Sequence, residues 1–309
     1  MLTHEDFAGP WAGLPVAWTE NDEFDEQTYR ADVARCCRAG VPGVYTGGTT
    51  GEFYAMEFEE FKAVARATVE ECRAHGTPVM VGCTSTYTLG AVRRAAYAAG
   101  IGADAVQVAL PFWMEVDDRQ VVSFFEAVAS AAPGLKLSIY ETTRSKKALT
   151  VDQHQAIKEA VPEYSMVKAN AGTAGCTPQG CEALSRFVRV FVSEDLWPSL
   201  GPRGAAGACS ALVYYNPRVV LALWEMLKQK DWEGLAEACR PIERLHEFLA
   251  GQYGSRGFTD TAYDRMGGAA GGFLRAGLRS RGPYPSATEA DVERLRQWYR
   301  ENFPEMLIL

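Results

Sequence analysis

Short apolar runs alternate with longer amphipathic segments along most of the chain. The short runs predict strands, and segments whose apolar residues recur three or four positions apart predict helices. Eight strands are predicted at residues 13–18, 43–46, 78–83, 105–109, 136–140, 165–168, 188–192 and 207–212. Helices are predicted after seven of them, at residues 25–39, 57–74, 89–99, 117–131, 151–160, 178–186 and 217–228.

This order predicts an α/β fold, a (β/α)8 TIM barrel with a small C-terminal helical extension. The strand runs are apolar on both faces, which suits a parallel sheet covered by helices, and eight strands close a barrel. A doubly wound sheet would be expected to carry a G-x-G-x-x-G turn after its first strand, and none follows Trp18. We expect residues 1–228 to form the barrel with the active site, and residues 229–309 to form the extension, with helices at 231–250, 259–268 and 287–301.

Composition excludes several classes of function. The 309 residues are 47% hydrophobic and 23% charged with a net charge of −8, and the basic residues are scattered, so no nucleic-acid partner is expected. No apolar run approaches the ~18 residues that span a bilayer, and residues 1–10 lack the apolar core of a secretory signal. The eight cysteines include no C-x-x-C pair, which favours reduced, mostly buried thiols in a cytoplasmic protein without a membrane partner.

Histidine is scarce and dispersed. The four residues, His4, His75, His154 and His246, form no metal-binding pattern and no basis for a Ser-His-Asp triad. Each is interpreted as a surface or helix-end residue, and no metal site is expected. Catalysis would then depend on lysine, tyrosine, cysteine, carboxylates or the backbone.

Polar residues follow several predicted strands, at the end where barrel enzymes carry their active sites. Residues 46–52 read Thr-Gly-Gly-Thr-Thr-Gly-Glu, where glycines allow close backbone approach and successive N–H groups can bind an anion such as a carboxylate, with the hydroxyls of Thr49 and Thr50 as further donors. Lys168 ends the sixth strand, where a desolvated, neutral amine can attack a ketone. Tyr140 ends the neighbouring fifth strand and could transfer a proton. Each feature taken alone has a simpler explanation. Residues 46–52 also fit a glycine-rich turn without a ligand, Lys168 also fits a lysine that reaches the barrel rim, and Tyr140 also fits an ordinary packing residue.

Two further strand ends are polar. Ser193 and Asp195 follow the seventh strand, and Cys209 lies in the eighth. Their side chains and backbone are candidates for lining the same mouth, although each also fits a loop cap. All these signals fall at one end of consecutive strands, which favours a shared site.

The chain from about Trp11 to Pro217 resembles the dihydrodipicolinate synthase / N-acetylneuraminate lyase family. Residues 48–52 match its G-[S/T]-T-G-E signature in full, and Gly172 matches a family glycine. The resemblance implies a class I aldolase mechanism without metal or organic cofactor, acting on a 2-oxo acid such as pyruvate, in a homotetramer built from dimers. It implies that Lys168 forms the Schiff base, that Tyr140 relays a proton and that the main chain of Cys209 touches the bound pyruvate. Taken together with the strand-end pattern, the expected catalytic residues are Lys168, Tyr140 and Thr50, and the expected substrate-binding residues are Thr49, Gly51, Asn170, Ser193, Asp195 and Cys209.

The chain also departs from the family pattern. The family often reads Y-N-x-P where this chain has Tyr140 followed by Glu141. Ser145, beside Arg144, stands where the synthases place an arginine for a second carboxylate, which argues against a role in lysine biosynthesis. Trp113 stands where the family lends a tyrosine to the neighbouring subunit, and an indole N–H donates a hydrogen bond but relays no proton. In the sialic acid lyases the position of Leu196 is a sugar-binding glutamate.

The sequence predicts a Schiff-base lyase that cleaves or forms a carbon–carbon bond to pyruvate. A dehydratase or deaminase of a 4-substituted 2-oxo acid would use the same lysine imine and stays open. A non-catalytic relative that binds a ligand is a third reading, and a metal-dependent aldolase is disfavoured by the scarcity of histidine. The role of Arg144, Lys146 and Lys147, in the loop after Tyr140, also stays open.

Overall fold

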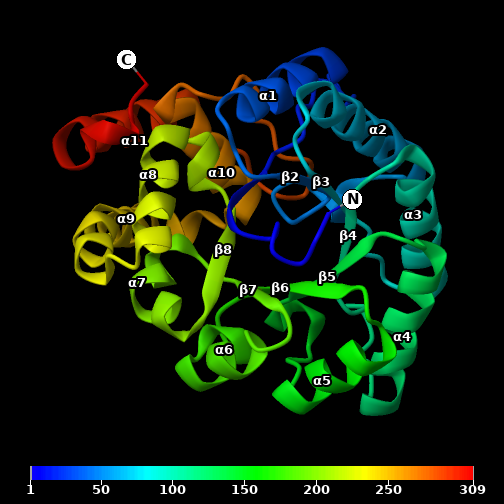
Figure 1. Cartoon of the computed structure of the whole chain (residues 1–309). Coiled ribbons are helices and arrows are strands. Elements are labelled where there is room, and N and C mark those ends of the chain that lie inside the picture. Colours follow the sequence, from blue (N-terminus) through cyan, green and yellow to red (C-terminus); the bar gives the residue numbers. More distant parts are fainter. Residues whose placement is uncertain (1, 309) are drawn as a thin grey trace. The chain divides into compact units, whose positions relative to one another are not determined.

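A computed structural model of the chain describes residues 2–308. The eight strands follow one another in sequence order in a closed barrel, so the predicted (β/α)8 class with a C-terminal helical extension is confirmed (Figure 1). The strands are β1 (Gly9–Gly13), β2 (Val44–Thr46), β3 (Val79–Gly82), β4 (Ala105–Val108), β5 (Lys136–Glu141), β6 (Tyr164–Ala169), β7 (Arg189–Phe191) and β8 (Ala205–Ser210). The helices are α1 (Glu26–Arg38), α2 (Phe58–His75), α3 (Thr88–Ile101), α4 (Asp118–Ala131), α5 (Val151–Ala160), α6 (Pro178–Leu184), α7 (Trp197–Leu200), α8 (Pro217–Gln229), α9 (Trp232–Tyr253), α10 (Asp260–Gly271) and α11 (Glu289–Asn302).

The helices begin where the sequence supplies N-terminal caps. Glu57, Asp117, Thr150 and Thr288 each accept a hydrogen bond from the backbone three residues on, and the residue at that position returns one, which satisfies N–H groups that a helix start leaves without partners. These capping boxes explain why the predicted starts of α2, α4, α5 and α11 lie within two residues of the observed ones.

By its internal contacts the chain forms two compact units, described separately below. The first contains the residues up to Gly9 and Pro78–Cys209, and therefore β3 to β7, nearly all of β8, and α3 to α7. The second contains Pro10–Thr77 and the residues from Ser210 onward, and therefore nearly all of β1, with β2, α1, α2 and α8 to α11.

In the first unit, consecutive parallel strands pair from β3 to β8. Gln107 of β4 donates to the Ser138 hydroxyl of β5 at 3.1 Å, and its amide nitrogen also lies 3.9 Å from the Cys209 sulfur of β8. Strands four places apart in the strand order can meet only across the interior, so these side chains point inward. Ser138 completes this inner layer by donating to the Met166 sulfur of β6 at 3.3 Å.

In the second unit, β1 pairs with β2 through Ala12 and Gly13, and the predicted position of the first strand was wrong. Residues 13–18 were expected to form it, whereas β1 is Gly9–Gly13. Pro15 lacks the N–H that a ladder requires, so pairing ends before it. Trp18 instead turns its indole N–H to Glu52 at 2.6 Å.

The eight cysteines are free thiols and six of them are buried, as predicted. Within residues 2–308, no helix combines the length and apolar character that crossing a membrane requires. No group of three or more His, Cys, Asp or Glu side chains in the same range is arranged to hold a metal ion.

Candidate active site

Tyr140 and Lys168 are direct partners in the parallel pairing of β5 with β6. Side chains alternate between the two faces of a strand, so a residue and the one two positions on share a face. Ser138 and Met166 are register partners that point inward, and Tyr140 and Lys168 lie two positions beyond them toward the carboxyl ends. The ammonium nitrogen of Lys168 lies 4.0 Å from the centroid of the Tyr140 ring. The two residues therefore share the inner face at the carboxyl end of the strands.

Cys209 lies near Lys168 on the same face. Burial raises the pKa of the Cys209 thiol to about 11, and the positive charge of Lys168 partly opposes that rise. A thiol with this pKa stays protonated at neutral pH, so Cys209 is neither a nucleophile nor a base there. The role of Cys209 in binding substrate stays a prediction.

The remaining predicted residues of the first unit lie in the loops after β6 and β7. The Asn170 carbonyl accepts hydrogen bonds from the backbone N–H and the hydroxyl of Thr173, at 3.1 and 2.7 Å. Gly172 between them has a φ of +84°, which favours glycine, and a Cβ there would lie 3.0 Å from the Thr143 side chain. The Ser193 hydroxyl donates to the Asp195 carboxylate.

In the second unit, the Gly-Thr-Thr-Gly-Glu segment forms a tight turn after β2. The Glu52 N–H donates to the Thr49 carbonyl at 2.9 Å. The Thr261 hydroxyl of α10 approaches the Thr49 and Thr50 carbonyls at 3.1 and 3.5 Å. The N–H of a trans peptide points opposite to its C=O, so the N–H groups of Thr50 and Gly51 point away from Thr261. Neither N–H group is directed at Thr261, and the binding of an anion by this turn stays a prediction.

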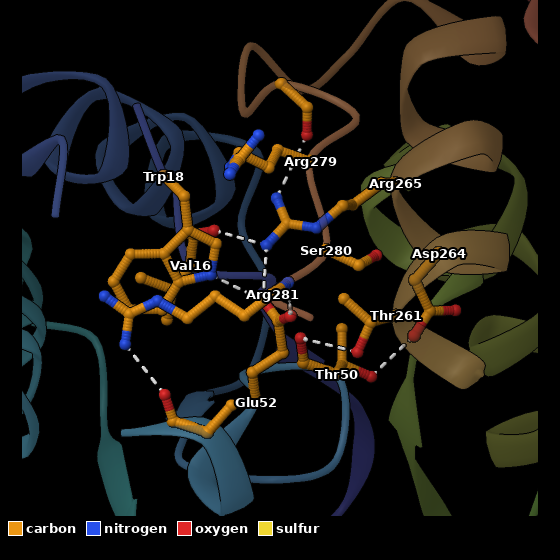
Figure 2. Close-up of polar contacts among 12 residues, drawn as sticks. Val16, Trp18, Thr50, Glu52, Thr261, Asp264, Arg265, Arg279, Ser280 and Arg281 are labelled. Atoms are coloured by element: carbon orange, nitrogen blue, oxygen red, sulfur yellow. Dashed lines mark hydrogen bonds and ion pairs between the residues drawn. The ribbon is translucent and has the colours of Figure 1, made fainter. Parts of the chain in front are cut away.

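Glu52 fixes this turn from within the protein interior (Figure 2). It adopts a left-handed φ of +55° and is fully buried. One carboxylate oxygen accepts from Arg265 of α10 at 2.7 Å and from the Trp18 indole, and the other accepts from the backbone N–H of Arg281 at 2.8 Å. Arg265 is equally buried and also donates to the Val16 carbonyl at 2.6 Å. The last residue of the signature is therefore a structural anchor.

Arg281 adds a second layer around the same turn. Its guanidinium lies 3.7 Å from the centroid of the Trp18 ring and forms two hydrogen bonds to the Glu60 carboxylate. It also donates to the Ala55 carbonyl at 2.7 Å. The segment after α10 is thereby tied to the start of α2 as well as to Glu52.

Thr50 contacts a carboxyl group that the sequence analysis did not identify. Its hydroxyl oxygen lies 2.5 Å from the Asp264 carboxyl oxygen, and the Tyr215 hydroxyl donates to the other Asp264 oxygen at 3.2 Å (Figure 2 shows the Thr50 contact). Burial raises the pKa of Asp264 to about 7, and the Thr50 and Tyr215 hydrogen bonds oppose that rise. The sequence feature that could have identified Asp264 is the pair of charged residues Asp264 and Arg265 within a helix of otherwise mostly small residues.

The expectation for histidine was wrong at His154, which is fully buried in α5. Its Nε2 lies 3.1 Å from the Glu141 carboxylate and its Nδ1 lies 2.8 Å from the Tyr164 hydroxyl. Glu141 also accepts the backbone N–H of Leu149 at 2.8 Å. The residue that replaces the family asparagine after Tyr140 thus belongs to a buried polar cluster of β5, α5 and β6.

Comparison with known proteins gives matches along most of the chain. A family model described as "Dihydrodipicolinate synthetase family" matches residues 6–280. The trans-2'-carboxybenzalpyruvate hydratase-aldolase of Nocardioides sp. (strain KP7) is 27% identical over 311 residues, covering 94% of this chain and 92% of the relative. The 4-hydroxy-tetrahydrodipicolinate synthase of Nitratidesulfovibrio vulgaris is 28% identical over 245 residues, covering 79% and 81%.

Solved structures match the fold at lower identity. A prophage protein of the dihydrodipicolinic acid synthase family from E. coli K12, in complex with pyruvate, has a TM-score of 0.85 at 18% identity and covers 96% of this chain and 98% of its own. A sialic acid aldolase of Ruminococcus gnavus, with its catalytic lysine mutated, has a TM-score of 0.86 at 18% identity, with coverage of 99% and 100%. These likenesses agree with the barrel described above.

The Glu52–Arg265 pair gives a stability prediction. Arg265→Met is expected to lower the free energy of unfolding by about 3–5 kcal/mol, because it leaves the buried Glu52 carboxylate without its counter-charge. Adding Glu52→Gln to that variant should restore part of the loss. Urea unfolding measures both. The matched control is Arg279→Met, which removes an exposed ion pair with Asp22 and should leave the unfolding midpoint nearly unchanged. Equal stability of the Arg265 and Arg279 variants would contradict the prediction.

Proposed function

Since this chain belongs to the dihydrodipicolinate synthetase family, whose named relatives are lyases and synthases, we propose that it is a lyase forming a Schiff base between Lys168 and a 2-oxo acid. The proposed reaction cleaves or forms the bond between C3 and C4, with pyruvate as the common partner. The observation that carries the proposal is the pairing of Lys168 with Tyr140 on one inner face, 4.0 Å from nitrogen to ring centroid.

The proposed cleavage proceeds through four steps. The neutral amine of Lys168 adds to the C2 ketone and water leaves, giving a protonated imine. The deprotonated phenol of Tyr140 accepts the proton of the C4 hydroxyl as the C3–C4 electron pair moves into the imine, so an aldehyde departs and an enamine stays on the lysine. Tyr140 then returns this proton to C3 of the enamine, which restores the protonated imine and the deprotonated phenol. Water then hydrolyses the imine, releasing pyruvate and the free amine.

The remaining predicted residues receive roles in binding. We propose that the turn containing Thr49, Thr50 and Gly51 binds the substrate carboxylate through backbone N–H groups, and the contacts of Thr261 with the Thr49 and Thr50 carbonyls leave those N–H groups directed away from α10. Asn170, Ser193, Asp195 and Cys209 are proposed to contact the rest of the substrate. No metal or organic cofactor enters the proposed steps.

Two features bear on the substrate. Ser145, at the position of the synthases' arginine, is buried and donates to the Thr142 carbonyl at 2.7 Å, which disfavours binding of a second carboxylate at that position. Lys146 donates to the Trp113 carbonyl and Lys147 pairs with Asp118, so structural contacts already account for both lysines. Arg144 is exposed. These contacts favour a lyase over a lysine-pathway synthase.

Loss of water or an amine at C4 from the same imine is the second candidate reaction. The relative from Nocardioides, which covers 94% of this chain, is named a hydratase-aldolase of an aryl-substituted unsaturated 2-oxo acid. We therefore include hydroxylated and aryl-substituted 2-oxo acids among the candidate substrates. If the chain is instead a non-catalytic binding protein, it should bind pyruvate and turn over none of these candidate substrates.

We also propose that the enzyme is a cytoplasmic homotetramer built from dimers. The free cysteines agree with a reducing compartment. Trp113 and Met114 are each 73% exposed, and a second copy of the chain is the proposed cover for them.

The Schiff base is tested by reductive trapping. Incubation with pyruvate and borohydride should label Lys168, and peptide mass analysis locates the adduct. Lys168→Ala should abolish labelling, whereas Lys228→Ala, on an exposed part of α8, should retain it. An adduct on another lysine, or none in the unaltered protein, would reject the imine.

The role of Tyr140 is tested separately from that of Lys168. Tyr140→Phe should reduce kcat for cleavage by about 10²–10⁴-fold, because the C4 hydroxyl loses its proton acceptor, while pyruvate trapping on Lys168 persists. Product analysis with the candidate substrates, with and without a chelator, distinguishes aldolase from dehydratase and from metal-dependent cleavage. A Tyr140→Phe enzyme with unaltered kcat would remove tyrosine from the mechanism.

The assembly is tested by light scattering. The native protein is expected to have four times the 309-residue chain mass, and Trp113→Asp should shift it toward smaller species by placing a charge on the proposed contact. Arg119→Asp, on an exposed residue of α4, is the control and should not change the mass. A monomeric native protein would contradict the proposal.

A further inference from the structure

The buried carboxyl of Asp264 contacts the hydroxyl of the turn proposed to bind the substrate carboxylate. The two oxygen atoms are 2.5 Å apart, and α10 supplies the carboxyl while the turn after β2 supplies the hydroxyl. Thr50 and Asp264 are both at most 9% exposed, so water contributes little to this contact. The adjacent Thr261 and Arg265 hold α10 against the same turn through the Thr49 carbonyl and Glu52.

A threonine hydroxyl carries a single hydrogen, and this limits what Thr50 can do. When Asp264 is ionised it can only accept, so Thr50 donates its hydrogen to Asp264 and presents only an acceptor oxygen to a ligand. When Asp264 is protonated it can donate to the Thr50 oxygen, which leaves the Thr50 hydrogen available to a second acceptor. A substrate carboxylate needs donors, so only the second state adds the hydroxyl to the turn's N–H groups.

We propose that Asp264 is a positioning residue that binds a proton together with the substrate carboxylate and thereby turns the Thr50 hydroxyl into a donor toward that carboxylate. This inference rests on the proposed function, because it assumes that the turn binds the carboxylate of a 2-oxo acid. It assigns to the site a proton that is taken up on binding and released when the product leaves. Asp264 itself exchanges no proton with the reacting carbon atoms.

The groups around Asp264 are consistent with a proton that is readily gained and lost. Burial raises its pKa to about 7, Asp260 on the same helix acts in the same direction, and Thr50, Tyr215 and Tyr214 oppose the rise. Burial, with a contribution from Asp264, raises the pKa of Tyr214 well above its ordinary value, so Tyr214 stays neutral. The neighbouring charges of Glu52 and Arg265 form an ion pair with each other. Asp264 is therefore the group at this turn that titrates near neutral pH.

The protonation of Asp264 determines how the binding of pyruvate should depend on pH. Below about pH 7 Asp264 is protonated before the ligand arrives, and binding costs no proton uptake. Above it, the concentration of pyruvate needed for half-maximal trapping of the imine should rise by about tenfold per pH unit through this group. The comparison is made between proteins that share Lys168, so that any other source of pH dependence in the trapping reaction is common to both.

The test measures half-saturating pyruvate for reductive trapping with cyanoborohydride from pH 6 to 8.5. In Asp264→Asn the amide donates to Thr50 at every pH, as the protonated acid does, so the ratio of wild-type to variant half-saturation should be near one at pH 6 and about thirtyfold at pH 8.5. Tyr215→Phe removes a hydrogen bond that lowers the Asp264 pKa, so in this variant half-saturating pyruvate should begin to rise at a higher pH than in the wild-type protein. If Asp264 had only a structural role, Tyr215→Phe would not shift the midpoint of the profile, which is the pH at which half-saturating pyruvate begins to rise.

The outcomes separate the two proposals. Trapping in both proteins with parallel pH profiles would overturn the role of Asp264 and leave the Schiff base intact. Failure of the wild-type protein to trap pyruvate at any pH would overturn the proposed function, and this inference with it. If Asp264→Asn does not fold, as judged by its thermal unfolding, the Tyr215→Phe midpoint decides, and an unshifted midpoint rejects the proposal.

Discussion

The parallel register of β5 and β6 is the constraint on which the candidate site depends. Because side chains alternate along a strand, the pairing of Ser138 with Met166 in the inner layer dictates that Tyr140 and Lys168 also point inward, one step nearer the carboxyl ends. A slip of one residue would turn one of the two outward. The chemistry proposed for the lysine therefore requires no special loop conformation at Lys168, only the register that barrel packing already enforces.

The turn after β2 is stabilised in a different way, by hydrogen bonds and an ion pair to the buried Glu52 carboxylate and not by strand register. A loop after a three-residue strand has little apolar surface of its own, and Glu52 occupies a backbone conformation that costs free energy for a residue other than glycine. Three donors from Arg265, Trp18 and the Arg281 backbone compensate for burying its carboxylate. Two of these donors come from the C-terminal segment. The C-terminal helical extension therefore stabilises the conformation of this turn.

The sequence predicted those features that depend on local pattern. Strand and helix order followed from periodicity, and the pairing of Tyr140 with Lys168 followed from their equivalent positions at the ends of neighbouring strands. The first strand was misplaced because residues 13–18 are as apolar as a strand, whereas hydrogen bonding past Pro15 fails. Asp264 and His154 were missed for another reason: each acquires its partners from residues that are distant in sequence or in another element, and a single sequence does not reveal such partners. The roles of Asn170, Ser193 and Asp195 in binding substrate stay predictions.

The departure of the sequence from the family at Glu141 has a structural account. A carboxylate in this buried position needs hydrogen bonds, and it receives them from the Leu149 N–H and from His154. One histidine tautomer satisfies the whole cluster, because Nε2–H can donate to Glu141 while Nδ1 accepts from the Tyr164 hydroxyl. Glu141 directly follows Tyr140, and Tyr164 begins the strand that ends near Lys168. The cluster therefore connects β5 and β6 through α5 as well as through their backbone pairing, and the substitution is compatible with the same placement of the tyrosine.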